Sequence, residues 1–352
     1  MRVRGVRIAR QETALPLSPP SAWLVWSLVI VATLGASTAG APGAPAPALR
    51  LAQAIALPGV EGRLDHLAVD VAGQRLFVAA LGNNTLEVID LRAGRRTSSL
   101  PGMREPQGVA FLPDRNRIVV ASGGAGECVV VDGGALRVIQ RIPCGDDADN
   151  VGYDRAAGLL YVGAERGRLT IVDAAGSRPV GQIALGGHPE AFVLEPDGPR
   201  VFVNVPTAGH VAVVDRHRRA VIATWSVSAA RANFPMAIDP ERRRLFVGCR
   251  QPARLLIYDL DAGRLVGEVA IAGDVDDLAY DATRRRIYAS GGAGAISVVE
   301  QVDADHYRPL DRVPTARGAR TALFVPDLDR LYVAVPHRGT QVAEVRAYAV
   351  SP

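Results

Sequence analysis

Short apolar stretches recur along the chain from about residue 49 to its end, separated by polar turns rich in Gly, Asp and Asn. The apolar positions are dominated by β-branched residues and show no helical period, so the pattern predicts β-strands throughout. One stretch returns seven times with little change: RLFVAA (75–80), RIVVAS (117–122), LLYVGA (159–164), RVFVNV (200–205), RLFVGC (244–249), RIYASG (286–291) and RLYVAV (330–335).

Positions equivalent between the copies lie 41 to 44 residues apart. A repeat in the low forties is typical of a four-stranded propeller blade. Within each repeat the pattern predicts an inner strand, the recurring strand, a third strand such as TLEVIDL (85–91), and an outer strand. We therefore predict an all-β, seven-bladed β-propeller over residues 49–352. A β-sandwich would not require seven similar units of one length.

The last repeat contains only three predicted strands, at 320–326, 330–335 and 343–349. The segment AIALPG (54–59) resembles QIALGG (182–187), which is the predicted outer strand of the third repeat. We expect this N-terminal strand to complete the seventh blade, so that the two ends of the ring interlock and leave no exposed sheet edge.

These repeats, with L-F-V, L-Y-V or I-V-V in the second strand and I-D or V-D in the third, resemble the YVTN-type β-propellers of the YncE family. The resemblance covers about residues 49–350 and implies an exported bacterial protein. The resemblance does not identify a ligand or a reaction, because β-propellers include binding proteins, lyases, lactonases and electron-transfer proteins.

The first 41 residues have the composition of a secretory signal peptide, with four arginines, an apolar run over residues 22–34 and small residues over 36–41. The apolar run is shorter than the ~20 residues that a membrane-spanning helix needs. Residues 42–48 are rich in Pro and Ala and predict a short tether. We expect cleavage near Ala41, a periplasmic or secreted protein, and no membrane span after cleavage.

Charge and composition exclude several kinds of site. Removing residues 1–41 lowers the formal net charge from +4 to +1, because four arginines and Glu12 are lost. The mature chain therefore has no strong basic field for nucleic acid. All 40 basic residues are arginines, which excludes a Schiff-base lysine and a Walker lysine. The sequence contains no Gly-x-Ser-x-Gly, His-Glu-x-x-His or Cys-x-x-Cys-His motif, so we expect no covalent haem.

The chain has three cysteines, Cys128, Cys144 and Cys249. The first two lie on neighbouring predicted strands, but the expected register places Cys128 opposite residues 139–141, so that it meets Cys144 at best diagonally. We interpret both as small buried side chains rather than a disulfide, although the pairing stays open. We expect Cys249 to be a free thiol.

In a propeller the inner strands start at the mouth of the central channel, so equivalent positions of the repeats form rings around it. Polar residues dominate these rings and some of the loops that follow the second strands. The candidate ligand-binding residues are Asp65, His66, Gln107, Asp149, Asn150, His188, Glu190, Asn233, Arg250, Asp276, Asp277, Arg320, His337 and Arg338.

Four carboxylates, Asp65, Asp149, Glu190 and Asp276, are also candidate ligands for a divalent cation such as Ca²⁺, Mg²⁺ or Zn²⁺. Like-charge repulsion in such a ring raises pKa values unless a cation or Arg320 compensates. The alternative is that these residues only cap turns around a water-filled channel.

Three functions stay open at this point. The first is binding of a small polar ligand, an ion or a periplasmic protein at the funnel mouth. The second is a metal-dependent hydrolase or lyase acting on a lactone or a similar electrophile. The third is a scaffold for a periplasmic redox protein. We expect a monomer in each case.

Overall fold

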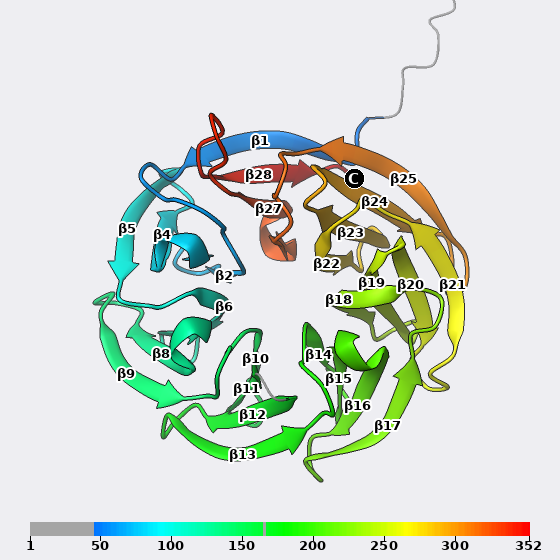
Figure 1. Ribbon diagram of the computed structural model, residues 1–352. Coiled ribbons are helices and arrows are strands. Elements are labelled where there is room, and N and C mark those ends of the chain that lie inside the picture. Colours follow the sequence, from blue (N-terminus) through cyan, green and yellow to red (C-terminus); the bar gives the residue numbers. More distant parts are fainter. Residues whose placement is uncertain (1–45, 165–166) are drawn as a thin grey trace, which may run out of the picture. The chain divides into compact units, whose positions relative to one another are not determined.

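The computed structural model describes residues 46–164 and 167–352, which form seven four-stranded antiparallel sheets arranged as blades around a central axis (Figure 1). The seven-bladed β-propeller predicted from the sequence is confirmed. The predicted signal peptide and the first four tether residues lie outside the described residues. Over the described ranges, no helix is long and apolar enough to cross a membrane.

The blades follow the chain in order, and within each blade the strands run from the channel to the rim. Blades 1 to 3 contain β2 (Leu67–Asp70), β3 (Arg75–Ala80), β4 (Thr85–Asp90) and β5 (Arg95–Pro101); β6 (Pro106–Leu112), β7 (Arg117–Ser122), β8 (Glu127–Asp132) and β9 (Val138–Pro143); β10 (Val151–Asp154), β11 (Leu159–Ala164), β12 (Arg168–Asp173) and β13 (Arg178–Ala184).

Blades 4 to 7 repeat this plan, and the last one takes its outer strand from the start of the described chain. They contain β14 (Phe192–Leu194), β15 (Arg200–Val205), β16 (His210–Asp215) and β17 (Ala220–Ser226); β18 (Arg231–Asp239), β19 (Arg244–Gln251), β20 (Ala253–Asp259) and β21 (Leu265–Ala270); β22 (Val275–Asp281), β23 (Arg286–Gly291), β24 (Ala295–Gln301) and β25 (Tyr307–Pro314); β26 (Ala322–Val325), β27 (Arg330–Val335), β28 (Glu344–Val350) and β1 (Leu49–Ala56).

The recurring apolar stretches form the second strand of each blade and supply the core. Their side chains are almost completely buried on both faces, because each blade is covered by a neighbour on either side. The buried apolar side chains form seven clusters, one at each junction between neighbouring blades. In one of them Phe77 of blade 1 packs with Val120 of blade 2. The core is therefore a ring of interfaces rather than one central cluster.

Ring closure follows the prediction from the incomplete last repeat. Strand β1 pairs antiparallel with β28, with Leu49 opposite Val350 and Ile55 opposite Val345 (Figure 1). The end of the predicted tether also belongs to blade 7, because Ala48 is buried and its carbonyl accepts the N–H of Ser351 at 3.0 Å, while its own N–H donates to Asp311 Oδ2 of blade 6 at 3.0 Å. Blade 7 thus includes residues slightly before residue 49.

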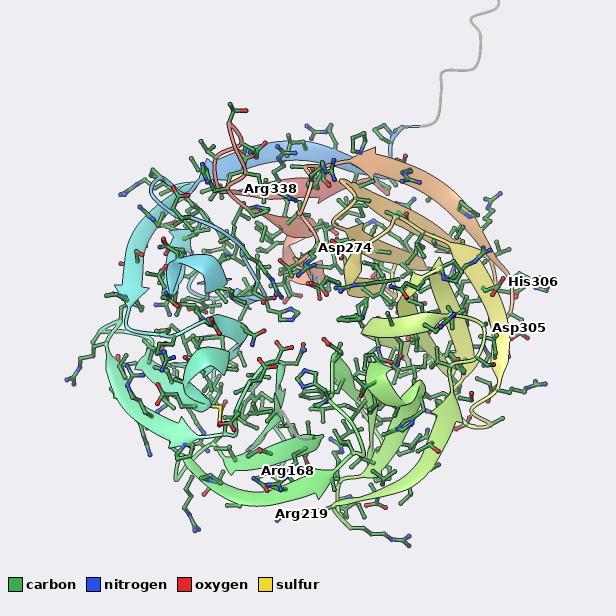
Figure 2. The ribbon with its side chains drawn as sticks, in the orientation of Figure 1. Arg168, Arg219, Asp274, Asp305, His306 and Arg338 are labelled. Atoms are coloured by element: carbon green, nitrogen blue, oxygen red, sulfur yellow. A yellow bond between two sulfur atoms is a disulfide. The ribbon has the colours of Figure 1, made fainter. Side chains whose placement is uncertain are left out.

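Cys128 and Cys144 form a disulfide, with their Cα atoms 5.8 Å apart, and the favoured interpretation of two free thiols is wrong (Figure 2). A β-bulge at Val130 and Val131 shifts the pairing of β8 with β9, so Cys128 faces Ile142. Cys144 then lies two residues further along, at the diagonal position, where the sulfurs can still bond. Cys249 is buried and free, as predicted.

Candidate functional site

The channel end of each inner strand is held by backbone hydrogen bonds that continue the sheet. Asp65 N donates to Ala79 O at 2.8 Å, and Asp149 N and Glu190 N make the equivalent bonds to Gly163 O and Asn204 O, both at 2.9 Å. Equivalent residues of different blades are therefore held in the same local position at the edge of the channel. This is why one offset in the repeat selects one ring of side chains.

A cavity of about 290 Å³ lies in this ring. Every residue lining it is polar or charged except Phe234. The lining residues are Arg63, Gln107, Asp147, Asp149, His188, Glu190, Phe234, Arg250, Asp276 and Arg320. Figure 2 shows side chains from all around the ring pointing into the centre. Seven of the fourteen predicted residues are thus brought together here, and we call this the funnel cavity.

Two arginines pair with Asp276, one of the four predicted metal-binding carboxylates. Asp276 Oδ2 lies 2.8 Å from Arg320 Nε, and its other oxygen accepts a hydrogen bond from Arg250. Arg250 is also fixed by a 2.9 Å hydrogen bond to Val275 O and by the face of Phe234, 3.6 Å from its guanidinium carbon. Asp276 is therefore held between two cations rather than repelled by its neighbours.

Asp149 and Glu190, unlike Asp276, are not paired with arginines among the described residues. Neither carboxyl group has a hydrogen bond or an ion pair with any of the described residues. Burial, together with the charge of Asp65, raises the pKa of Asp149 to about 7. Burial, together with the charge of Asp149, raises the pKa of Glu190 to about 8. Near neutral pH these two groups can present either a donor O–H or an accepting carboxylate to a molecule in the cavity.

His66 lies between two carboxyl groups, of which that of Asp65 is buried and that of Asp277 is half-buried. Its Nε2 is 3.8 Å from Asp65 Oδ1, and its Nδ1 is 3.6 Å from Asp277 Oδ2. Burial opposes protonation of His66, but the charges of Asp277 and Asp65 outweigh it and raise the pKa of His66 well above its usual range. Asp65 also pairs with Arg63 at 2.7 Å, and Asp277 accepts the N–H of Ala322 at 2.7 Å. Of these residues, Arg63 lines the funnel cavity, whereas the predicted Asp65, His66 and Asp277 do not.

The carboxylates do not converge on one point. Over residues 46–164 and 167–352, no group of three or more His, Cys, Asp or Glu side chains is arranged to hold a metal ion. Asp65 and Asp276 instead engage arginines, while Asp149 and Glu190 have no partner among the described residues. The arrangement therefore gives no support to the cation site predicted on Asp65, Asp149, Glu190 and Asp276.

Some predicted residues have other surroundings. Asn233 is fully buried, and its side-chain N–H groups donate to Asn204 Oδ1 and to the carbonyl of His210, so it ties β18 to blade 4. Asn150 does not line the cavity, and its carbonyl accepts the N–H of Gly163 within blade 3. Gln107 and His188 do face the cavity, and both contact Asp147. Gln107 Nε2 donates to Asp147 Oδ1 at 3.0 Å, and His188 Nε2 lies 3.9 Å from Asp147 Oδ2.

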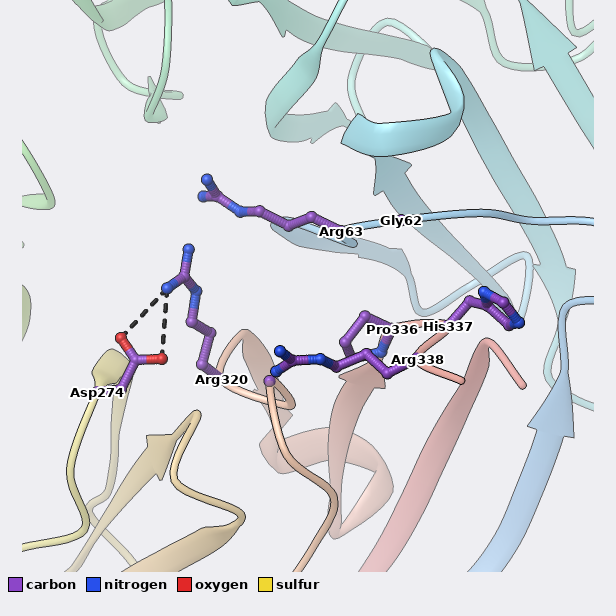
Figure 3. Close-up of a pocket in the computed structure, with 8 residues that line it drawn as sticks. Gly62, Arg63, Asp274, Arg320, Pro336, His337 and Arg338 are labelled. Carbon is purple, nitrogen blue, oxygen red and sulfur yellow. Dashed lines mark hydrogen bonds and ion pairs between the residues drawn. The ribbon is translucent and has the colours of Figure 1, made fainter. Parts of the chain in front are cut away.

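His337 and Arg338 line a second pocket of about 320 Å³ beside the funnel cavity (Figure 3). It lies between blades 6, 7 and 1 and shares Arg63 and Arg320 with the funnel cavity. We call it the rim pocket. Its lining residues are Gly62, Arg63, Asp274, Gly318, Arg320, Pro336, His337 and Arg338.

Arg63, Asp147, Phe234 and Asp274 line the two pockets but are absent from the residues chosen as candidates. All four occupy ring positions that the repeat alignment identifies. Arg63, Asp147 and Asp274 lie two residues before Asp65, Asp149 and Asp276. The sequence thus contained a signal for them, but it did not tell which ring positions face the cavity.

No protein-family model matches the chain. Part of it is similar to curated 6-phosphogluconolactonases: it is 32% identical over 104 residues to that of Enterobacter sp. (strain 638) and 33% identical over 104 residues to that of Cronobacter sakazakii. Each match covers 28% of this chain and 31% of the relative. The chain thus matches about three tenths of these relatives' length.

Two solved structures resemble the whole ring. Kuenenia stuttgartiensis hydrazine synthase has a TM-score of 0.70 at 17% identity, covering 82% of this chain and 98% of that one. A chain in the crystal structure of the mitotic checkpoint complex has a TM-score of 0.73 at 15% identity, covering 93% of this chain and 99% of that one. At such low identity, these likenesses support the propeller fold and nothing further.

Proposed function

We propose that this protein binds a small, hydroxyl-rich polar ligand in the funnel cavity. The observation that carries the proposal is the pair of carboxyl groups of Asp149 and Glu190, which line the cavity, are half-buried, and have no hydrogen-bond or ion-pair partner among residues 46–164 and 167–352. Both groups are accessible from the cavity, so a ligand that enters it can make their hydrogen bonds in place of water.

The charge pattern favours ligands with both donor and acceptor groups. Arg63, Arg250 and Arg320 present N–H donors only, while Asp149 and Glu190 can donate or accept near neutral pH. A sugar acid or polyol satisfies both kinds of partner through its hydroxyl and carboxylate oxygens. A volume of about 290 Å³ is at the lower end of the range of small-molecule sites.

A second candidate function is hydrolysis of a lactone, which the partial similarity to 6-phosphogluconolactonases supports. In this reaction ionised Glu190 accepts a proton from water while the water oxygen attacks the lactone carbonyl carbon. Arg250 or Arg320 stabilises the negative oxygen that forms. The ring C–O bond then breaks, and the leaving oxygen takes the proton from Glu190. No metal ion is needed in this sequence of steps.

Calorimetric titration with gluconate, glucose and glucono-1,5-lactone tests binding. We expect at least one probe to bind, and Glu190→Gln to weaken it by about tenfold through the loss of a charge-sensitive hydrogen bond. Arg155→Ala, an exposed arginine in the β10–β11 turn, is the control and should leave binding unchanged. Failure of all three probes to bind at millimolar concentration would contradict this class of ligand.

A pH-stat assay of glucono-1,5-lactone separates the enzyme from the binding protein. A lactonase should exceed the spontaneous rate, with activity rising through pH 8 as Glu190 ionises. Glu190→Gln should lose this activity. A protein that binds gluconate without accelerating hydrolysis is a binding protein only.

We also propose that the protein acts outside the cytoplasm. The basic and apolar composition of residues 1–41 supports export, and the Cys128–Cys144 disulfide is typical of an oxidising compartment. Fractionation of cells that express the full chain, with N-terminal sequencing of the mature protein, tests this. A product that starts at Met1 in the cytoplasm would contradict it.

A further inference from the structure

The rim pocket carries an excess of positive charge. Three guanidinium groups, of Arg63, Arg320 and Arg338, line it, and the only carboxylate among its lining residues is Asp274. Asp274 already accepts a 3.2 Å hydrogen bond from Arg320 and lies 3.6 Å from Arg250 Nε. His337 is engaged elsewhere, with its Nδ1 2.7 Å from Glu61 Oε2.

Arg338 differs from the other two arginines. Its side chain has no hydrogen bond or ion pair to any residue of the described chain, and it extends toward Arg320, whereas the His337 ring points away (Figure 3). It is carried by the loop between β27 and β28, where Arg338 and Gln341 exchange two backbone hydrogen bonds of 2.9 Å. The loop is thus fixed while the guanidinium stays available.

The two paired arginines also keep free donors. A guanidinium has five N–H groups. Arg63 uses Nη2 toward Asp65, and Arg320 uses Nε and Nη1 toward Asp276 and Asp274. Each therefore has donors left for a further acceptor. Close packing also shapes the pocket: Gly318 has a φ of +83°, and a Cβ there would lie 3.1 Å from Pro336 and 3.3 Å from Arg338.

We propose that the rim pocket is an oxyanion subsite, in which Arg338, with Arg63 and Arg320, binds a phosphate or carboxylate group. Because Arg63 and Arg320 line both pockets, the body of the same ligand would lie in the funnel cavity, so this part of the inference rests on the proposed function. Arginine forks suit planar carboxylates and phosphates alike.

Titration with inorganic phosphate and, separately, with acetate at constant ionic strength tests the subsite alone. We expect Arg338→Ala to weaken binding of the preferred anion by about tenfold, and Arg338→Lys to restore it only in part, since lysine cannot bind in a bidentate way. Arg155→Ala removes the same charge from an exposed turn and should have no effect. Melting curves confirm that each variant is folded.

The outcomes distinguish the two proposals. If the protein binds phosphate but not acetate, the rim pocket is specific for a phosphate group. If it binds both comparably, the rim pocket accepts either kind of oxyanion. If neither anion binds at millimolar concentration, or if Arg338→Ala binds them as well as the native chain, the subsite is wrong. If Arg338→Ala weakens phosphate binding while gluconate, glucose and glucono-1,5-lactone all fail to bind at millimolar concentration, the subsite stands and the funnel function fails.

Discussion

The guanidinium of Arg200 in blade 4 donates a 2.8 Å hydrogen bond to the carbonyl oxygen of Leu260 in blade 5, sixty residues further along the chain. The same side chain pairs with Glu195 of its own blade at 2.6 Å and lies over the ring of Phe202. Arg200 is the first residue of one of the seven recurring stretches. In blade 4, the arginine of the repeat therefore connects the blade to its successor.

Other copies of this arginine make the same kind of contact. Four further pairs join neighbouring blades: Arg75 with Gly133 O, Arg117 with Ser177 Oγ, Arg244 with Ala304 O, and Arg286 with Ser351 O. In blade 3 the position is Leu159, which cannot make this bond. Because the contacts bridge blades, they stabilise the ring rather than the single sheets.

Replacing Arg200 with Met should lower the free energy of unfolding by about 2 kcal/mol, because the inter-blade hydrogen bond and an ion pair of buried Glu195 are lost. The effect should be larger at pH 7 than at pH 3. Hydrogen bonds from Arg200 and Arg243 hold the pKa of Glu195 below its usual range, so their contribution is lost as pH falls. Urea unfolding at both pH values checks this, with Leu159→Met as a control. Equal losses at the two pH values would contradict the role of the ion pair.

Asp149→Asn and Asp276→Asn should have opposite effects on stability at pH 8. Asp149 has no partner in the described part of the chain and its pKa is raised, so its ionisation in the folded state is unfavourable, and the Asn variant should be more stable by on the order of 3 kcal/mol. Asp276 neutralises Arg250 and Arg320, so its loss should destabilise by about 3 kcal/mol. Thermal melts measure both.

The raised pKa of Asp149 also predicts how the stability of the folded protein changes with pH. A carboxyl group whose pKa is raised on folding contributes stability that is fully present below its unfolded pKa and is lost as pH rises through the folded value. For Asp149 this loss should occur between about pH 4 and pH 7. The stability of the native chain relative to Asp149→Asn should therefore fall across this window. A stability difference that is constant from pH 4 to pH 8 would contradict the raised pKa.

Thiol titration of the denatured, non-reduced protein should find one thiol, that of Cys249. The Cys128→Ala/Cys144→Ala double variant should be less stable by about 3 kcal/mol, because the bond closes a loop of sixteen residues. A titration that finds three thiols would show that the disulfide does not form. Cys249→Ala serves as the control, since it leaves the disulfide intact.

Deleting residues 42–58 should open the ring. The deletion removes β1, leaves β28 with an unpaired edge and uncovers the cluster that contains Ile55 and Val345. We expect loss of the cooperative melt or concentration-dependent association, measured by calorimetry and light scattering. Ala54→Ser, at an exposed position of the same strand, should change neither. An unchanged melt of the truncated chain would contradict closure by β1.

The sequence by itself determined the blade plan. Strands repeat at a fixed period, and burial between neighbouring blades requires the same apolar pattern in each copy, so RLFVAA and its relatives coincide with the second strands. The incomplete last repeat likewise predicted the pairing of β1 with β28. Equivalent offsets also placed Asp149, Glu190 and Asp276 at one cavity, because equivalent residues of a propeller occupy equivalent places.

Only the tertiary structure decided which of these residues are charged partners and which stand alone. Asp149 and Asp276 occupy the same offset in their repeats, yet of these two residues only Asp276 pairs with Arg250 and Arg320. A bulge at Val130 brought Cys128 and Cys144 within bonding distance, and Asn233 turned into the sheet to bond Asn204. Such outcomes depend on distances of a few ångströms between different blades, and a repeat period carries no information about them.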